Sequence, residues 1–240
     1  MDRPIGQRLL SEAVGTFTLI FIGAGSIIAA NAAGVASGAF GQPGAAGAGL
    51  VTIALAHGLA IGVMVSAVGH VSGGHFNPAV TLAVWVTRRI GTGAASLYIL
   101  TQLAAATLGA LALRLLMPGP TWEPVSLGTP LVNPGLADWQ AIAIEAVLTF
   151  LLVWVIFATA VDPAGSFNKI AGLAIGFTIA MDIMMGGPFT GAAMNPARSF
   201  GPAIVSGEIV GMWVYFLGPI IGGTIAALLY DLGILKRSTA

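Results

Sequence analysis

The motif SGGHFNPAVTLA spans residues 72–83, and a second version of it, TGAAMNPARSFG, spans residues 190–201. Both versions contain Asn-Pro-Ala, beginning at Asn77 and at Asn195, an offset of 118 residues. Asparagine is a favoured N-cap residue, and proline suits the first helical position because its missing N–H would have no partner there. Each motif therefore predicts the start of a helix.

The apolar pieces that follow the motifs, 77–87 and 195–206, are too short to cross a bilayer, which takes about 20 helical residues. Other apolar stretches are long enough. They cover residues 8–30, 49–70, 94–116, 139–160, 168–187 and 211–233. The sequence therefore predicts an all-α membrane protein with six transmembrane helices and two half-helices.

The composition agrees with a membrane protein and excludes several other classes. Only 8% of the 240 residues are charged, 57% are hydrophobic, and the mean hydropathy is +0.94. The formal net charge is zero with no basic block, so we expect no nucleic-acid partner. Without cysteine and with three histidines, the chain offers no nucleophile–base pair or metal cluster that stands out. We expect neither an enzyme nor a bound cofactor or metal.

The similarity between the two halves extends beyond the motifs and predicts an inverted repeat. Matching segments are 55–58 with 173–176, 98–111 with 215–228, and 11–17 with 144–150. Three spans and a half-helix thus occur twice, in repeats of about 8–116 and 139–233.

Because three is an odd number of spans, the second repeat enters the membrane from the opposite side. Such symmetry brings the half-helices together, N-terminus to N-terminus, near the bilayer midplane. The loops before them should then line a watery cavity, since non-helical backbone at that depth is otherwise not tolerated.

Small residues at helical spacing occur at equivalent places in both repeats. They are Ala54, Gly58 and Gly62 in the second predicted span, and Gly172, Gly176 and Ala180 in the fifth. Small residues at this spacing allow membrane helices to cross closely. We therefore expect these small residues to have a packing role in both helices.

Basic residues predict the orientation in the membrane. Seven of the nine lie on one side of the predicted topology: Arg3, Arg8, Arg88, Arg89, Lys169, Lys236 and Arg237. The positive-inside rule then places both termini in the cytoplasm. The exceptions are Arg114, which we expect to be structural, either snorkelling or paired at the interface, and Arg198, inside the second half-helix.

Paired motifs of this kind, GHFNPAVT at 74–81 and AMNPARSF at 193–200, resemble the aquaporin (major intrinsic protein) family. The chain looks most similar to the tonoplast intrinsic proteins of plants and to prokaryotic water channels. The resemblance implies a single channel domain over 1–240, assembled as a homotetramer, that passes water and excludes ions and protons. We expect the plasma (inner) membrane of a prokaryote as its location, with a vacuolar membrane as the alternative.

The resemblance also implies roles for particular residues. The pore motifs are Asn77, Pro78, Ala79, Asn195, Pro196 and Ala197. Family spacing places the selectivity filter at His57, Ile183, Ala192 and Arg198. Extended backbone with carbonyls facing the pore is expected at Gly73, Gly74, His75, Gly191 and Ala193. Glu12 and Glu145 would brace the loops by accepting hydrogen bonds.

The solute range follows from the filter set. Strict water channels carry an aromatic ring at the position of His57 and a histidine at that of Ile183, so this aperture should be less restricted. Passage of ammonia, hydrogen peroxide or urea is therefore a hypothesis. Glycerol is disfavoured, because Ser199, Ala203 and Tyr215-Phe216 replace the residues typical of glycerol channels.

Other interpretations stay open at this point. A secondary transporter also uses inverted repeats and broken helices, and an adhesive membrane protein would pass nothing. Arg198 has the alternative of an interfacial structural arginine, and His57 that of a satisfied buried imidazole. Asp182 either pairs near the outer mouth or tunes the filter. For His70 and His75 we expect roles in loop structure, with a pH gate as the alternative.

Overall fold

The computed structural model describes residues 3–34, 46–165 and 170–235. Within these ranges the chain is helical, with no strand. The basic residues Lys169, Lys236 and Arg237 lie outside the described residues. Segments long and apolar enough to span a membrane are Ile5–Ala32, Gly49–Ser72, Thr92–Leu116, Asp138–Val161, Ala171–Thr190 and Val214–Gly233. The predicted set of six spans is confirmed, with ends that differ by a few residues.

The first span contains three helical segments in continuous sequence. They are α1 (Ile5–Thr18), the π-helical turn η1 (Leu19–Ala24) and α2 (Gly25–Ala32). The other spans are α3 (Ala46–Ser72), α5 (Thr92–Leu116), α7 (Asp138–Ile156) extended by the π turn η3 (Phe157–Val161), α8 (Ala171–Thr190) and α10 (Val214–Gly233). Neither π turn was predicted from the sequence.

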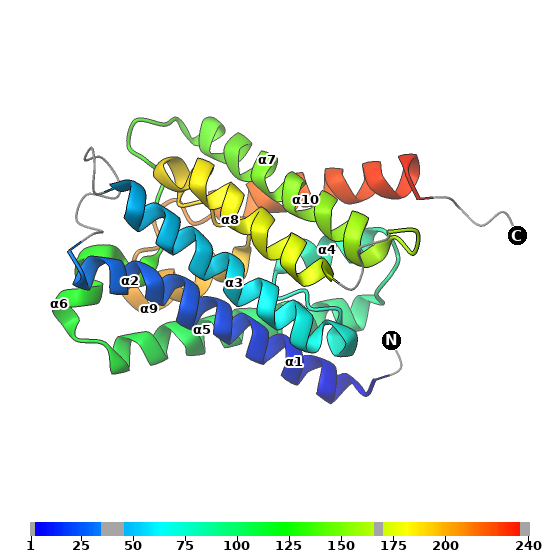
Figure 1. The fold of residues 1–240 in the computed structure, drawn as a ribbon, viewed down its shortest axis with the longest axis horizontal. Coiled ribbons are helices and arrows are strands. Elements are labelled where there is room, and N and C mark those ends of the chain that lie inside the picture. Colours follow the sequence, from blue (N-terminus) through cyan, green and yellow to red (C-terminus); the bar gives the residue numbers. More distant parts are fainter. Residues whose placement is uncertain (1–2, 35–45, 166–169, 236–240) are drawn as a thin grey trace, which may run out of the picture.

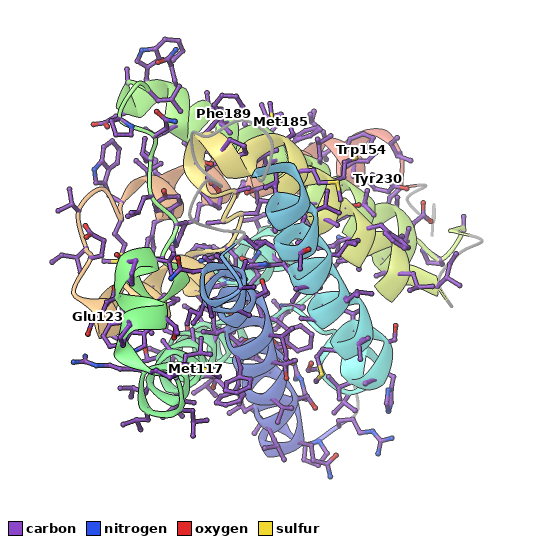
Figure 2. All side chains as sticks on the ribbon, turned by 60° about the vertical axis from the view of Figure 1, so that its left-hand side comes forward. Met117, Glu123, Trp154, Met185, Phe189 and Tyr230 are labelled. Carbon is purple, nitrogen blue, oxygen red and sulfur yellow. The ribbon has the colours of Figure 1, made fainter. Side chains whose placement is uncertain are left out.

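The outer surface of the bundle is apolar, as a bilayer requires. In Figure 2 the side chains of Met185 and Phe189 project outward from α8, and they are 57% and 42% exposed. Leu100, Leu108 and Phe177 are likewise exposed on other parts of the spans. Exposing large apolar side chains to water on every span would be unfavourable. The outer surface of the bundle is therefore suited to contact with lipid.

Helices α3 and α8 lie side by side (Figure 1) and contact each other through their small residues. A Cβ added to Gly58 would collide with the carbonyl oxygen of Gly176, and one added to Gly62 would lie 3.0 Å from the carbonyl oxygen of Gly172. The absent side chains therefore let the two backbones touch. The packing role expected of these small residues is confirmed, and the structure adds that the second and fifth spans are each other's partners.

The two half-helices are α4 (Pro78–Val86) and α9 (Pro196–Ser206). In each, asparagine is the N-cap and proline the first helical residue, as the motifs predict. Helix α4 packs against α10 and α5, and α9 packs against α5. Figure 1 shows α9 toward the end that carries the short helix α6 (Gly119–Trp122), and α4 toward the opposite end.

Polar contacts hold the ends of the half-helices. Arg89, just after α4, forms an ion pair of 2.8 Å with Asp231 in α10. At the other end, Nη1 of Arg114 donates to the carbonyl oxygen of Val205, 2.8 Å away in the last turn of α9, and its guanidinium lies over the ring of Trp122. A cation at a helix C-terminus is favourable because the last carbonyls are unpaired there. Arg114 is thus paired, which is one of the two structural roles expected of it.

Candidate channel pore

The N-termini of α4 and α9 meet inside the bundle, where Asn77 and Asn195 cap them. The Oδ1 atom of Asn77 accepts from the backbone N–H of Ala79 at 2.8 Å, and Oδ1 of Asn195 accepts from Ala197 at 2.9 Å. Both asparagines are buried. Each cap satisfies N–H groups that have no partner within the helix.

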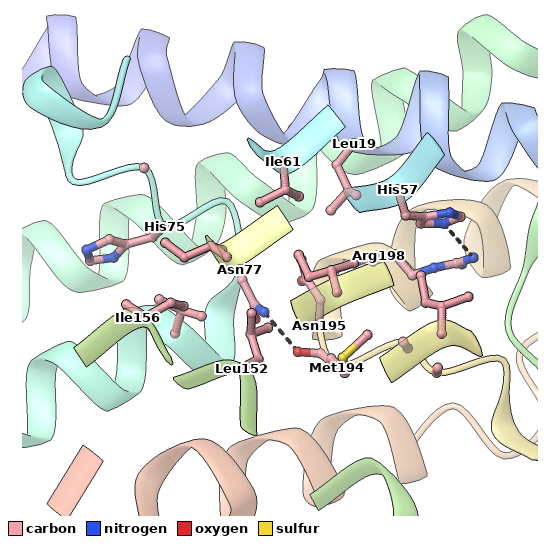
Figure 3. A pocket seen from close by; sticks show the side chains of 17 residues that line it. Leu19, His57, Ile61, His75, Asn77, Leu152, Ile156, Met194, Asn195 and Arg198 are labelled. Atoms are coloured by element: carbon pink, nitrogen blue, oxygen red, sulfur yellow. Dashed lines mark hydrogen bonds between the residues drawn. The ribbon is translucent and has the colours of Figure 1, made fainter. Parts of the chain in front are cut away.

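The Nδ2 atoms of the same asparagines tie the two halves of the chain together. Asn77 donates to the carbonyl oxygen of Met194 at 2.8 Å, and Asn195 donates to that of Phe76 at 2.9 Å. The first of these bonds is drawn in Figure 3. A side-chain amide carries two N–H groups, so one on each asparagine remains for another acceptor.

The loops that lead into the asparagines contain left-handed residues. In the first loop Gly73, Gly74 and Phe76 have φ of 94°, 63° and 48°. In the second, Gly191, Ala192 and Met194 have φ of 78°, 46° and 52°. The prediction of extended backbone is corrected at Gly73, Gly74 and Gly191, because a positive φ lies outside the extended region. For His75 and Ala193 it stays a prediction. Non-glycine residues with a positive φ are strained and need firm support from their surroundings.

Glu12 supports the first loop from α1. Its Oε1 accepts from the hydroxyl of Ser72 at 2.7 Å and from the N–H of His75 at 3.0 Å, and its Oε2 accepts from the N–H of Phe76 at 2.7 Å. The amide of Gln102 adds a bond of 2.8 Å to Oε2. Glu12 has no exposed surface. All four partners are donors, so a carboxylate suits the position.

Glu145 supports the second loop from α7 in the same way. Its Oε1 accepts from the hydroxyl of Thr190 at 2.7 Å and from the N–H of Ala193 at 2.9 Å. Its Oε2 accepts from the N–H of Met194 at 2.7 Å. These contacts agree with the bracing that the resemblance implied for both glutamates. The second half has no counterpart of Gln102, because Pro219 stands at the equivalent position.

Two tyrosines complete the supports, and neither was predicted from the sequence to have this role. The hydroxyl of Tyr98 donates to the carbonyl oxygen of Ser72, and that of Tyr215 donates to the carbonyl oxygen of Thr190, both at 2.8 Å. All four residues lie within the segments that match between the two repeats. The equivalent placement of the tyrosines was therefore a usable signal.

A narrow cavity of about 460 Å³ runs past the asparagines (Figure 3). Its walls are mostly aliphatic, with polar groups concentrated at a few points. Predicted residues among its lining are His57, Gly74, His75, Asn77, Ile183, Ala192, Ala193, Asn195 and Arg198. Gly73, Pro78, Ala79, Pro196 and Ala197 are not part of the lining, and Gly191 lines the vestibule described next. We call this space the pore cavity.

A second, wider cavity of about 1140 Å³ opens beyond it, and we call this the vestibule. Loop residues between Pro124 and Pro134 form much of its wall. The residues His57, Ile183 and Arg198 line both cavities. The boundary between vestibule and pore cavity is therefore made by three of the four residues predicted for the filter, and Ala192 lies on the pore side of it.

Hydrogen bonds at this boundary fix the state of the His57 ring. Nδ1 lies 2.9 Å from the carbonyl oxygen of Ile53, and Nε2 lies 3.2 Å from Nη2 of Arg198 (Figure 3). A carbonyl only accepts and a guanidinium only donates. The hydrogen is therefore on Nδ1, Nε2 accepts, and the imidazole is neutral.

The loop that precedes α7 holds Arg198 from the opposite side. Nη1 of Arg198 donates to the carbonyl oxygen of Gly128 at 2.8 Å. Gly128 ends the short helical turn η2 (Glu123–Gly128), in which Ser126, Leu127 and Gly128 are all left-handed, with φ of 46°, 55° and 72°. This contact was not predicted from the sequence, because the segment has no counterpart in the first repeat. Nη1 and Nη2 each keep a second hydrogen for another acceptor.

The remaining candidates lie apart from the boundary. Asp182 is buried, and its Oδ2 has no hydrogen-bond partner in the structure. His75 lines the pore cavity, where its Nδ1 lies 3.1 Å from the hydroxyl of Thr81 and its ring packs edge-on against Tyr98. His70 is exposed in the last turn of α3.

In the part of the chain that the structure describes, six spans, two facing half-helices and a narrow internal cavity define a membrane channel. Comparison with known proteins identifies its family, since residues 3–230 match the family described as Major intrinsic protein. The chain belongs to the major intrinsic protein family, as the paired motifs suggested.

Several relatives match almost the whole chain. Aquaporin TIP4-4 of Zea mays is 44% identical, over 94% of this chain and 85% of its own length. Probable aquaporin TIP3-2 of Arabidopsis thaliana is also 44% identical, over 94% and 82%, and probable aquaporin TIP4-1 of Oryza sativa subsp. japonica is 41% identical, over 99% and 91%. The chain is therefore a passive channel for water and small solutes, and not an enzyme.

A solved structure supports the fold. The X-ray structure of the aquaglyceroporin from Plasmodium falciparum superposes with a TM-score of 0.81, over 96% of this chain and 97% of that one, at 24% sequence identity. The fold class predicted from the motifs and the repeat is confirmed.

Proposed function

We propose that the channel passes water in single file through the pore cavity and selects solutes at the boundary formed by His57, Ile183 and Arg198. The observation that carries this proposal is that these three side chains, and no others, line both cavities as the structure describes them. A solute must pass between them to cross from the vestibule to the asparagines.

A water molecule that enters a narrow passage loses hydrogen bonds to other waters, and groups in the wall must replace them. Arg198 offers its unused Nη hydrogens at the boundary, and Asn77 and Asn195 each offer one Nδ2 hydrogen at the centre. A water molecule that accepts from both asparagines turns its own hydrogens away from them. It cannot then accept a proton from a neighbouring water, which interrupts proton hopping.

Cations are opposed by charge as well as by dehydration. Arg198 is a fixed positive charge at the boundary. Helices α4 and α9 add about half a positive charge each, because their N-termini face the cavity. Desolvating an ion costs on the order of tens of kcal/mol in an apolar medium, whereas a neutral solute gives up only a few hydrogen bonds. Neutral molecules therefore pass and ions do not.

The aliphatic and small residues at the boundary favour solutes somewhat larger than water. Ile183 and Ala192 add no polar group and no aromatic ring to it. We include ammonia, hydrogen peroxide and urea in the proposed range. Glycerol is left out because Ser199, Ala203 and Tyr215-Phe216 differ from the residues typical of glycerol channels.

The proposal extends to assembly and orientation. The family resemblance supports a homotetramer, and the basic residues near α1 and α4 support an orientation with both termini in the cytoplasm. The beginning of α1 and the end of α10 lie at the same end of the bundle (Figure 1).

The reported relatives are plant proteins, so the expected prokaryotic membrane has no support from them, and a vacuolar membrane becomes the better proposal.

Osmotic shrinkage of proteoliposomes tests the function. Wild-type protein should raise water permeability above that of empty vesicles, with a flux linear in the osmotic gradient and a low activation energy. A flux that saturates would instead favour a secondary transporter, and no flux at all would favour an adhesive protein. Arg198→Ala should admit cations and His57→Ala should raise urea flux. Unchanged selectivity in both variants would contradict the proposed filter.

A further inference from the structure

Gly23 lies in the π turn η1 of the first span and packs against the ring of His57. A Cβ added at Gly23 would lie 2.6 Å from Cδ2 of His57, 2.8 Å from Nε2 and 3.0 Å from Cγ. Real Cβ atoms do not approach ring atoms so closely, and both residues are buried. The imidazole therefore occupies space that any side chain at position 23 would take.

Contacts of two ring atoms limit how the imidazole of His57 can move to make room for such a side chain. Nδ1 is held by the carbonyl oxygen of Ile53, and Nε2 is within reach of Arg198. His57 lines both the vestibule and the pore cavity, so a displaced ring would enter space that solutes use. A side chain at position 23 would push the imidazole into the passage or away from Arg198.

The π turn brings Gly23 to this place. It inserts an extra residue into the helical repeat between α1 and α2, and such turns occur frequently at functional sites. Leu19, the first residue of the same turn, lines the pore cavity. Gly25, two residues after Gly23, instead faces the side chain of Leu113 in α5.

We propose that Gly23 is a positioning residue for selectivity: by lacking a side chain it sets the place of the His57 ring and thereby the aperture between His57, Ile183 and Arg198. This inference rests on the proposed function of that boundary. Gly23 belongs to a different span from every residue predicted for the filter, and it acts only through His57.

A double-mutant cycle with Gly23→Ala and His57→Ala tests the inference in proteoliposomes. Permeability to water and to urea is measured per inserted protein. Gly23→Ala should lower urea permeability by about tenfold, the effect of about 1.4 kcal/mol on a barrier, and water permeability by less. In the His57→Ala background the same change should leave both permeabilities unaltered, because the ring that it displaces is gone. Gly25→Ala is the matched control and should leave selectivity as in wild type, since the one atom within 4 Å of its added Cβ is Cδ2 of Leu113, at 3.1 Å, and not an atom of His57.

Several results would overturn the inference. One is an equal loss with and without the His57 ring, and another is an unchanged permeability in Gly23→Ala. If Gly23→Ala fails to insert, the double variant must recover insertion, and failure to recover also counts against it. If wild type excludes urea, the cycle is decided on water alone. If the wild-type protein itself gives no water flux above that of empty vesicles, the proposed function is contradicted instead.

Discussion

The side-chain amide of Asn77 donates to the main-chain carbonyl of Met194 across 2.8 Å, joining the half-helix of one repeat to the loop of the other. In the opposite sense, the side-chain amide of Asn195 in the second repeat donates to the main-chain carbonyl of Phe76 in the loop of the first repeat. Each asparagine therefore has two separate tasks, since Oδ1 caps its own helix and Nδ2 holds the opposite loop.

Replacing Asn77 tests these tasks separately. Asn77→Asp keeps an oxygen that caps α4 but removes the donor to Met194, whereas Asn77→Ala removes both. Leaving the buried carbonyl of Met194 unpaired costs about 1–3 kcal/mol, and the lost cap adds about 0.5–2 kcal/mol. We expect thermal unfolding in detergent to rank wild type above Asn77→Asp. Wild-type stability together with wild-type proton exclusion in Asn77→Asp would contradict this account.

Glu145→Gln should destabilise the channel more than Glu12→Gln. In both variants an NH₂ group would face the N–H of a loop residue, at a cost of about 1–3 kcal/mol. At Glu12 the neighbouring Gln102 can turn its amide and present an oxygen, whereas Pro219 stands at the equivalent place near Glu145. Thermal unfolding of the two variants side by side measures the difference. Equal losses would show that Gln102 gives no relief.

Gly58→Ala should separate α3 from α8. The added methyl group would collide with the backbone of Gly176, which cannot move as a side chain can. Overpacking of this kind costs about 1–3 kcal/mol. Gly91→Ala is a matched control, because nothing lies within 4 Å of its added Cβ. Detergent stability should fall only for Gly58→Ala, and a similar fall in both would point to glycine flexibility rather than to the crossing.

Mercuric chloride should not block the wild-type channel through a thiol, because the chain has no cysteine. Ala192→Cys places a thiol in the wall of the pore cavity and should make water permeability sensitive to mercury, reversibly with a reducing agent. Leu115→Cys, at a position 81% exposed on the outside of α5, serves as the control. Inhibition of Leu115→Cys as strong as that of Ala192→Cys would refute a pore position for residue 192.

Much of the fold was predictable because membrane spans and helix caps are local signals. The N-caps at Asn77 and Asn195 were identified correctly, and the predicted spans differ from the observed ones mainly at their ends. The fifth span was expected to stop at residue 187 but runs through Pro188 to Thr190. The fixed φ of proline is compatible with a helix near its end, where one lost hydrogen bond is tolerated.

The site was predictable where the two repeats correspond, and less so elsewhere. Glu12 and Glu145 were found through their equivalent positions. Gly128 and Gly23 were missed, because neither a loop carbonyl nor a glycine beside an imidazole leaves a pattern in sequence. Their importance depends on three-dimensional proximity to Arg198 and His57. The left-handed residues Phe76 and Met194 were missed for a similar reason, since φ is set by the bonds to the glutamates and asparagines.

The crossed bonds of the two asparagines have a consequence for biogenesis. When the first repeat leaves the ribosome, the carbonyl of Phe76 has no partner, because Asn195 is 119 residues further along the chain. An unpaired buried carbonyl is costly, and contacts between residues so far apart in sequence form late because the chain between them must first be ordered. Both crossed bonds therefore need the second repeat to be present, so the pore wall cannot be completed before it has been made. A chain truncated after the first repeat should insert its spans and still lack a formed pore wall.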